Sequence, residues 1–496
     1  MGTPRSLVLM TVDCLRADHV GFLGYPRPTT PFLDSLAAES CIVANAIVGG
    51  APTYYSFPAI MASRHPLALG RDVIGLAPEE TTIASVLNQL GYPTAAFLAG
   101  NPYLSRRFGY ASGFDTFHDF LDAEIGSPSD SSVRAGSSSL RGRLNSTLAE
   151  LCHKLGPAGP LYDELYFQYC QRLAASRAQS LDVMRRFPAA DVIVDRARDW
   201  LARLAGGPFF LWLHFMDPHS PYYPPPKALD SMGHSQLNPS RARYLNSYWN
   251  RGDLAANRLK RHRDEVVALY DAGIRWVDTQ VARLVETLRE LGQWENCVVG
   301  LTADHGEEFL DHGGRYHPPS KVTEELVRVP LLLRAPDLVR TESGKTPFSL
   351  LHLAPTLLEA VNVPVPASFR GRSHWMQLQK GDWEGRAIIE CVAGCTNPFR
   401  VNNRLGTRVL AIREARYKLV LDFGASSEQL FDLEADPAEL RPLPSSADKP
   451  VRRRLLEHGR QHLANSLQSR NADERMGARL RDIQLEWAHS AAKIST

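Results

Sequence analysis

Short apolar runs alternate with amphipathic stretches along the first part of the chain. Residues 7–12 and 94–99 are apolar runs of strand length, and residues 82–91 have the spacing of a helix that ends at a glycine. A continuous apolar run is typical of a strand buried on both faces. Strands that alternate with helices usually form a parallel sheet covered by helices. The pattern therefore predicts an α/β protein with a large, mostly parallel mixed sheet flanked by helices.

Two of the predicted strands end in side chains that bind cations. Residues 7–12 lead directly to Asp13, and the apolar run 297–303 leads to Asp304 and His305. Parallel strands bring their carboxyl ends to one edge of a sheet. A single aspartate in this position could be explained as the cap of a following helix. Two such endings together, with the imidazole, indicate a divalent-cation site.

These strand ends resemble the sulfatase family of the alkaline phosphatase superfamily. The resemblance rests on residues 11–18 and 302–313, and further segments follow in the family's order. Those further segments are 27–39, 209–222, 324–334, 412–420 and 430–439. The resemblance implies a catalytic domain over residues 1–380. A smaller C-terminal α+β subdomain, with a small sheet and a helical tail, is implied over residues 381–496.

The position of the family's nucleophile holds an unexpected residue. Sulfatases carry a Cys or Ser that is oxidised to formylglycine, within a Cys/Ser-x-Pro-x-Arg motif. Counting from the flanking segments that resemble the family places Thr53 at the nucleophile position, and Tyr55 and Phe57 then replace Pro and Arg. Threonine cannot be oxidised to an aldehyde, so we expect direct attack by a hydroxyl that a metal activates. Ser56 is the alternative nucleophile, because Ser56 and Pro58 match part of the motif three residues late. If both hydroxyls only cap a helix, the protein is a catalytically silent relative.

Downstream histidines and a lysine supply the remaining candidate chemistry. The resemblance implies that His219 contacts the transferred group or protonates the leaving group, a task for which imidazole is suited. It also implies a cationic contact to the ester oxygens from His317 or Lys321, and the spacing does not decide between them. His214 lies inside an apolar run and is expected to be a hydrogen-bonded core residue.

The number of metal ions is open at this stage. Asp13, Asp304 and His305 predict one divalent cation, Ca²⁺ or else Mg²⁺ or Mn²⁺. In the alternative, a Zn²⁺ pair is bound, with Asp217, His219 and His317 completing the second site. Cys14 replaces a second metal-flanking aspartate of many sulfatases, and we expect it to be a small buried hydrophobe.

The resemblance implies hydrolysis of a small anionic ester, either a sulfate or a phosphate ester, through a covalent Thr or Ser intermediate. A sulfated threonine lacks the easy breakdown that a geminal diol provides, so a phosphodiesterase or a phosphonate monoester hydrolase is a serious alternative. The same residues also allow a phospho- or sulfo-group transferase, or a catalytically silent binding protein. The organic part of the substrate has no recognisable code in the sequence.

Composition narrows the range of partners. The 496-residue chain has a formal net charge of +2, which predicts no nucleic-acid partner. No apolar stretch reaches the roughly 18 residues that a membrane span requires. Seven cysteines without zinc-finger spacing predict a cytoplasmic protein. An oligomer remains possible.

Two insertions are expected to approach the site. A helical insertion over about residues 124–186 begins with a Ser- and Gly-rich loop and contains several aromatic residues, among them Tyr166 and Tyr169. Aromatic residues at helical spacing usually face a core. A polar insertion covers about residues 231–261.

Overall fold

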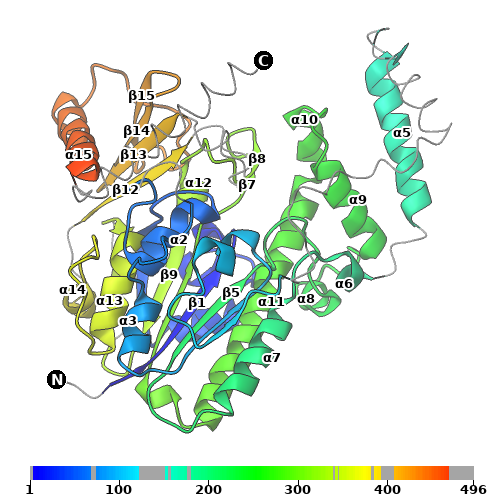
Figure 1. Cartoon of the computed structure of the whole chain (residues 1–496). Coiled ribbons are helices and arrows are strands. Elements are labelled where there is room, and N and C mark those ends of the chain that lie inside the picture. The colour runs from blue at the N-terminus through cyan, green and yellow to red at the C-terminus, as the bar shows by residue number, and fades with distance from the viewer. Residues whose placement is uncertain are drawn as a thin grey trace, which may run out of the picture.

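The computed structural model describes residues 4–68, 74–121, 151–152, 154, 158–175, 180–338, 341–343, 346–380, 385–392 and 407–468. Within these ranges a large sheet and a small sheet are joined by helices (Figure 1).

The large sheet has nine strands in the order β10-β2-β9-β6-β1-β5-β3-β4, and β11 pairs with β2. Strand β1 lies at its centre and runs parallel to both β6 and β5. Strand β9 is antiparallel to β2 and to β6, so the sheet is mixed but mostly parallel, as predicted. The strands are β1 Ser6–Val12, β2 Cys41–Ile47, β3 Thr94–Leu98, β4 Thr116–His118, β5 Phe210–Phe215, β6 Cys297–Ala303, β9 Arg328–Arg334, β10 Thr341–Ser343 and β11 Phe348–Ser349.

Helices cover both faces of this sheet, with α7 and α11 on one side and α2, α3 and α13 on the other (Figure 1). This covering explains why the central strands are continuous apolar runs. The α-helices described before residue 381 are α1 Pro31–Ala37, α2 Thr53–Ala62, α3 Ile83–Gln89, α5 Ala158–Ala175, α6 Leu181–Met184, α7 Ala190–Leu201, α8 Pro226–Ser231, α9 Pro239–Trp249, α10 Ala256–Leu259, α11 Arg263–Glu290, α12 Glu324–Val327, α13 Leu353–Ala360 and α14 Trp375–Lys380.

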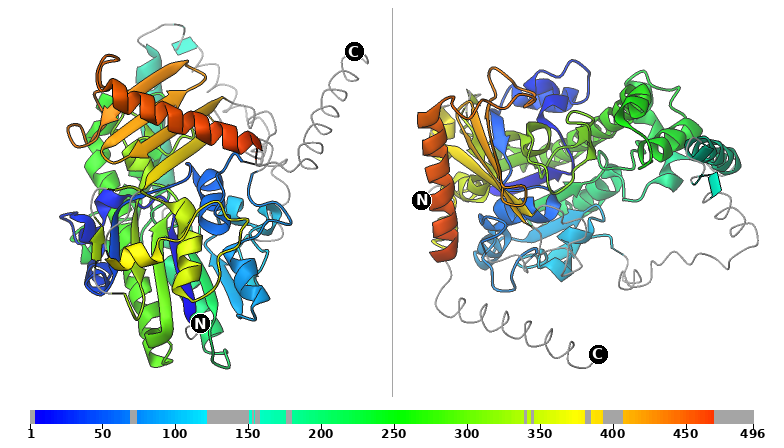
Figure 2. Two further views of the ribbon diagram at one scale, coloured as in Figure 1. Left: turned by 90° about the vertical axis from the view of Figure 1, so that its left-hand side faces the viewer. Right: turned by 90° about the horizontal axis from the view of Figure 1, so that it is seen from above.

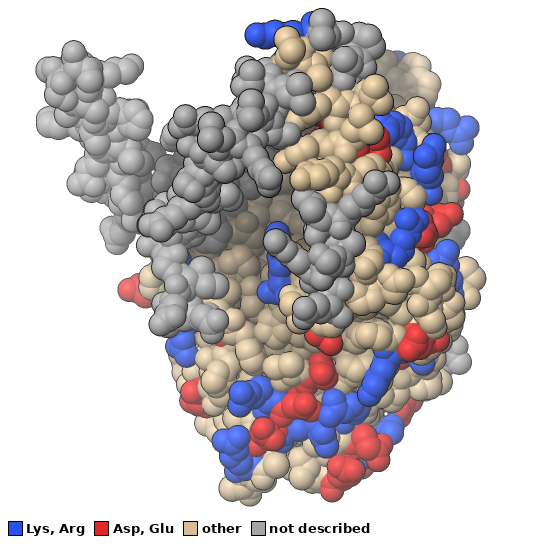
Figure 3. All heavy atoms as spheres, turned by 90° about the vertical axis from the view of Figure 1, so that its right-hand side faces the viewer, with Lys and Arg blue, Asp and Glu red and all other residues tan. Residues whose placement is uncertain are grey.

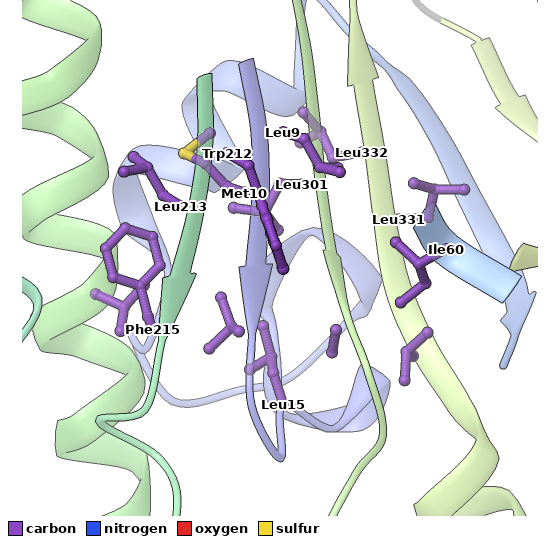
Figure 4. Packing of buried hydrophobic residues seen from close by; sticks show 14 of the residues in the cluster. Leu9, Met10, Leu15, Ile60, Trp212, Leu213, Phe215, Leu301, Leu331 and Leu332 are labelled. Atoms are coloured by element: carbon purple, nitrogen blue, oxygen red, sulfur yellow. The ribbon is translucent and has the colours of Figure 1, made fainter. Parts of the chain in front are cut away.

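Side chains from four adjacent strands form the core of the sheet (Figure 4). Leu9, Trp212, Leu301 and Leu332 come from β1, β5, β6 and β9, and all four are fully buried. Burying each such side chain contributes roughly 1.5–3 kcal/mol. This packing fixes the ends of the strands, and therefore the side chains that follow them.

The C-terminal subdomain is an antiparallel sheet with the strand order β12-β13-β14-β15, and α15 lies across it (Figure 2). Its elements are β12 Arg386–Val392, β13 Arg408–Glu414, β14 Tyr417–Asp422, β15 Ser427–Asp432 and α15 Lys449–Gln468. It has a small core of its own, in which Leu455 of α15 packs with leucine and isoleucine side chains of the sheet. Buried Lys418 of this subdomain forms an ion pair with Glu324, which precedes β9 of the large sheet, at 3.1 Å. It forms a second ion pair within the subdomain, with Glu439, at 2.9 Å. The predicted boundary at residue 381 lies outside the described residues.

The helical insertion is described only from residue 151 onward, with gaps, so the predicted loop at its start lies outside the described residues. Figure 1 shows α5 at the edge of the molecule beside α9. Phe167 packs against Tyr244 and Tyr248 of α9. The interpretation of the aromatic stripe as core is wrong for Tyr166 and Tyr169, which are 42% and 57% exposed. These two tyrosines are therefore not part of a core within the described residues.

Acidic and basic side chains are interspersed on the lower part of the face shown in Figure 3. Among the described residues, no helix has the length and the apolar character needed to cross a bilayer.

Candidate active site

The three predicted metal ligands meet at the carboxyl edge of the large sheet. Val12 of β1 is paired with Ala303 of β6, so the residues that follow these strands lie side by side. The Nε2 atom of His305 lies 3.7 Å from Oδ1 of Asp13 and 3.5 Å from Oδ2 of Asp304. All three side chains are fully buried. The sequence prediction that these residues lie together agrees with this geometry.

The electrostatics of the two carboxylates favour a cation. Burial would raise the pKa of Asp13, but His219, His214 and His305 hold that pKa well below its usual range. Burial and then repulsion from Asp13 raise the pKa of Asp304. Oδ2 of Asp304 is buried and has no hydrogen-bond partner among the described residues. A bound cation would stabilise both carboxylates in the charged state.

Thr53 lies against this cluster as the first residue of α2. Its Oγ1 is 3.2 Å from Nε2 of His305, and its side chain is buried. The hydroxyl of Ser56 points differently, since it donates a hydrogen bond to the carbonyl of Thr53 at 3.2 Å. The geometry thus separates the two candidate nucleophiles: Thr53 contacts the ligand cluster, and Ser56 satisfies the first turn of its own helix.

The donors around His305 are of the kinds that bind a divalent cation. Ligands held about 2.0–2.5 Å from one ion are roughly 3–3.5 Å from each other. The distances from Nε2 of His305 to Thr53 and Asp304 are 3.2 and 3.5 Å, and the distance to Asp13 is slightly longer, at 3.7 Å. This mixed set of oxygen and nitrogen donors fits a divalent cation bound beside His305.

Two further histidines lie beside the cluster. His219 follows β5, and His317 follows the hairpin of β7 Glu308–Phe309 and β8 Arg315–Tyr316. The ring of His317 has its centre 4.5 Å from that of His305 and 5.1 Å from that of His219. The candidate ligand atoms of Cys14, His219 and His317 all lie within 4.8 Å of one another. The structure thus brings both predicted histidines to the site.

Cys14 lies between these groups. Its Sγ is 3.0 Å from Oδ1 of Asp13 and 3.4 Å from Nδ1 of His317. Burial first, and then the negative charge of Glu307, raise the pKa of this thiol well above its usual range. The side chain is therefore a neutral, buried thiol at neutral pH, which agrees with its interpretation as a small buried hydrophobe.

Asp217 and Lys321 have other partners. Oδ1 of Asp217 accepts a hydrogen bond from the backbone N–H of Ala190, the first residue of α7, and burial raises the pKa of Asp217 to about 7. The ammonium of Lys321 lies 2.8 and 2.7 Å from the two carboxylate oxygens of buried Glu308. Among the described residues, no hydrogen bond or ion pair links either side chain to Asp13, Asp304 or His305.

Sequence reasoning missed Asn101 and Glu307 as supporting residues, and it assigned His214 to the core alone. Asn101 donates to Oδ2 of Asp13 at 2.9 Å, and Nε2 of His214 lies 3.5 Å from the same oxygen. Oε1 of buried Glu307 lies 3.3 Å from Nδ1 of His317. Asn101 follows β3 at the same sheet edge, so its strand-end position was an available signal. His214 is hydrogen-bonded in the core as expected, at 2.9 Å from Oγ1 of Thr11, and it also faces a candidate metal ligand.

Comparison with known proteins agrees with this architecture. The chain is similar to an arylsulfatase of Clostridium perfringens, with 24% identity over 94% of this chain and 95% of that protein. It is also similar to bovine arylsulfatase K, with 26% identity over 50% of each chain, so it spans about half the length of that relative. A solved structure, the phosphonate monoester hydrolase of Silicibacter pomeroyi, superposes with a TM-score of 0.65 and 19% identity over 94% of this chain and 96% of that one.

Family sequence models give the assignment. The model of an N-sulphoglucosamine sulphohydrolase C-terminal region matches residues 315–463. The model named Sulfatase matches residues 5–363, which include both strand ends of the site. This protein belongs to the sulfatase family of the alkaline phosphatase superfamily.

Proposed function

We propose that this protein is a metal-dependent hydrolase of sulfate- or phosphate-type esters in which Thr53 is the covalent nucleophile. The observation that carries the proposal is the 3.2 Å contact between the Thr53 hydroxyl and His305, inside a buried cluster that also contains Asp13 and Asp304. A hydroxyl beside buried carboxylates can serve only as a hydrogen-bond donor, or it can serve as a nucleophile. Oδ2 of Asp304 is buried without a hydrogen bond in the described part of the chain, which favours a bound cation there and hence the role of nucleophile for Thr53.

Asp13, Asp304 and His305 would hold one divalent cation, which when bound supplies Lewis-acid polarisation of the ester and activation of a nearby hydroxyl. An imidazole nitrogen in the donor set favours Mn²⁺ or Zn²⁺ over Ca²⁺, which prefers oxygen ligands throughout. A Zn²⁺ pair would require a second set around His219 and His317. Asp217, the third predicted member of that set, instead bonds to the start of α7.

The hydroxyl oxygen of Thr53 forms a bond to the sulfur or phosphorus while the bond from that atom to the oxygen of the leaving alcohol breaks, and the hydroxyl proton passes to solvent water. The first-turn position is suited to an anionic substrate, because the N-terminal end of a helix carries partial positive charge. Water then attacks the covalent intermediate and regenerates the hydroxyl.

His219 and His317 complete the proposed reaction. His219 has its Nδ1 2.5 Å from the carbonyl of Ser220, so Nδ1 carries a proton and Nε2 is left to face the leaving group. From that position His219 protonates the departing alcohol. His317, whose ring lies beside that of His305, offsets the charge on the ester oxygens. The pairing of Lys321 with Glu308 favours His317 over Lys321 for this contact.

The nucleophile also bears on the substrate. Thr53 has no route to the aldehyde hydrate through which other sulfatases release sulfate, whereas a phosphorylated threonine can be hydrolysed by direct attack at phosphorus. A phosphodiester or a phosphonate monoester is therefore the substrate class that we favour. The phosphonate monoester hydrolase similarity supports the fold for this chemistry and does not by itself assign the substrate.

The test is turnover of matched aryl sulfate, phosphate monoester, phosphodiester and phosphonate substrates. Each substrate is assayed with Ca²⁺, Mg²⁺, Mn²⁺ or Zn²⁺ on wild-type protein, Thr53→Ala and Ser56→Ala. We expect metal-dependent hydrolysis of a phosphorus ester that Thr53→Ala abolishes and Ser56→Ala largely retains.

Other results have defined meanings. Activity that survives Thr53→Ala and is lost in Ser56→Ala would move the nucleophile to Ser56. Transfer to an added acceptor alcohol in place of water would identify a transferase. Metal binding without turnover of any of the four substrates would contradict the hydrolase proposal and indicate a silent binding protein.

A further inference from the structure

A second group of metal-binding side chains lies where the catalytic domain meets the C-terminal subdomain. It consists of His65, three residues beyond the end of α2, Glu390 of β12 and His462 of α15. One candidate ligand atom from each residue lies within 4.8 Å of the other two. The three residues come from separate elements, so no sequence spacing reveals the group.

The contacts within the group are close. Nε2 of His462 lies 2.8 Å from Oε1 of Glu390, and the ring centres of His65 and His462 are 4.4 Å apart. Glu390 is fully buried and His462 is 8% exposed. Nδ1 of His65 is buried and has no hydrogen-bond partner within the part of the chain that the structure describes. Such an unsatisfied nitrogen is costly unless some ligand binds nearby.

The group offers one carboxylate and two imidazoles, and a charged carboxylate with neutral imidazoles is the form in which these side chains bind metals.

We propose that His65, Glu390 and His462 form a zinc site that joins the two domains. Two imidazoles and one carboxylate are a standard donor set for Zn²⁺. Arg408 lies 3.7 Å from Oε1 of Glu390 and competes with the ion for that oxygen, so the affinity is expected to be moderate. This proposal does not depend on the function proposed for Thr53.

Glu390 of this group also contacts the chain on both sides of α2, the helix that begins with Thr53. The backbone N–H of Glu390 donates to the carbonyl of Gly49 at 2.9 Å, and Oε2 of Glu390 accepts from the N–H of Leu67 at 3.1 Å. Gly49 precedes α2 and Leu67 follows it, so Glu390 contacts the chain on both sides of the helix that begins with Thr53. Zinc at Glu390 would hold the C-terminal subdomain against both ends of that helix.

Zinc stoichiometry tests the proposal directly. Chelator-treated protein is titrated with Zn²⁺ by calorimetry, and bound zinc is measured by mass spectrometry after dialysis. The experiment uses Asp304→Asn, which removes one carboxylate of the Thr53 cluster, and the same variant carrying His65→Gln. Because other candidate ligands remain in both proteins, the comparison is the difference between them: we expect Asp304→Asn to bind one zinc equivalent more than the double variant, or to bind that equivalent at least tenfold more tightly. If both bind zinc equally, the proposal is wrong.

Two controls keep this result interpretable. His352→Gln replaces another histidine lining the same cavity as His65, and in the Asp304→Asn background it should keep the zinc equivalent. Cobalt replaces zinc in a second measurement on Asp304→Asn without further substitutions, so that it does not depend on the folding of His65→Gln. Intense visible bands of tetrahedral Co²⁺ are expected, and their absence would also overturn the proposal. Failure of the Thr53 proposal would instead appear as activity that survives Thr53→Ala, or as no turnover of any of the four substrates by the wild type, without any change in these zinc measurements.

Discussion

The hydroxyl oxygen of Thr53 lies 3.2 Å from Nε2 of His305. Because Thr53 is the first residue of α2 and His305 follows β6, this contact joins the start of α2 to the central strands of the sheet. The helix therefore presents its first hydroxyl to the same edge at which Asp13 and Asp304 lie.

The first prediction concerns the chemical group at position 53. Thr53→Ser keeps the hydroxyl, so we expect kcat/KM within about tenfold of the wild-type value. Thr53→Val keeps the shape and removes the hydroxyl, so we expect a loss of at least about 10³-fold. Steady-state kinetics on the preferred substrate measures both variants. Equal activity in Thr53→Val and Thr53→Ser would refute nucleophilic attack by this residue.

The second prediction concerns His214, which we infer to be a positioning residue for Asp13. Nε2 of His214 lies 3.5 Å from Oδ2 of Asp13, so His214→Gln should weaken binding of the catalytic metal by about 10–100-fold. At saturating metal the kcat should recover. Metal titration of activity separates the two effects, and His374→Gln, at a buried histidine elsewhere in the fold, serves as the control. An unchanged metal dependence would show that His214 is only a core residue.

The third prediction concerns the ion pair between Lys321 and Glu308. The side chain of Glu308 is fully buried and Nζ of Lys321 lies 2.7 Å from it, so Lys321→Met should lower the free energy of unfolding by about 3 kcal/mol. Replacing the carboxylate as well, in Lys321→Met with Glu308→Gln, should restore much of that loss. Urea unfolding measures the stability of each variant. A large rise in KM with unchanged stability would instead assign Lys321 to the substrate.

The fourth prediction is a pH dependence at Asp278 of α11. The backbone N–H groups of Phe32 and Leu33 donate to this carboxylate at 3.1 and 2.8 Å, yet burial raises its pKa from 3.8 to about 6. Because the folded state holds the proton more tightly, the stabilising contribution of this group is complete below pH 3.8. That contribution is lost as the pH rises through about 6.

Relative to the wild type, Asp278→Asn should therefore gain about 1–3 kcal/mol of stability between pH 4 and pH 8. This gain is added to a cost that does not depend on pH, because the amide can accept only one of the two backbone N–H groups. Thermal unfolding at a series of pH values measures this difference. Glu286→Gln, at an exposed position on the same helix, should show no such trend. A difference that is constant with pH would contradict the assignment of the raised pKa.

The sequence by itself determined the sheet and the first members of the site. The apolar runs that become β1 and β6 are buried on both faces, and parallel pairing then places the next residues of both strands together. Asp13, Asp304 and His305 could be predicted for this reason. Thr53 could be aligned with the nucleophile position of the family, because the segments before and after it follow the order of the family's motifs.

Tertiary structure decided what each side chain beyond the strand ends contacts. The sequence allowed His317 and Lys321 equally, and only the buried carboxylate of Glu308 distinguishes them by binding the lysine. Asp217 follows β5, which ends beside the site, but its carboxylate accepts a hydrogen bond from the first residue of α7. The group around Glu390 joins three elements distant in the chain. Periodicity and motif order fix strands and their ends, whereas the partner of a loop side chain depends on which distant elements pack against it.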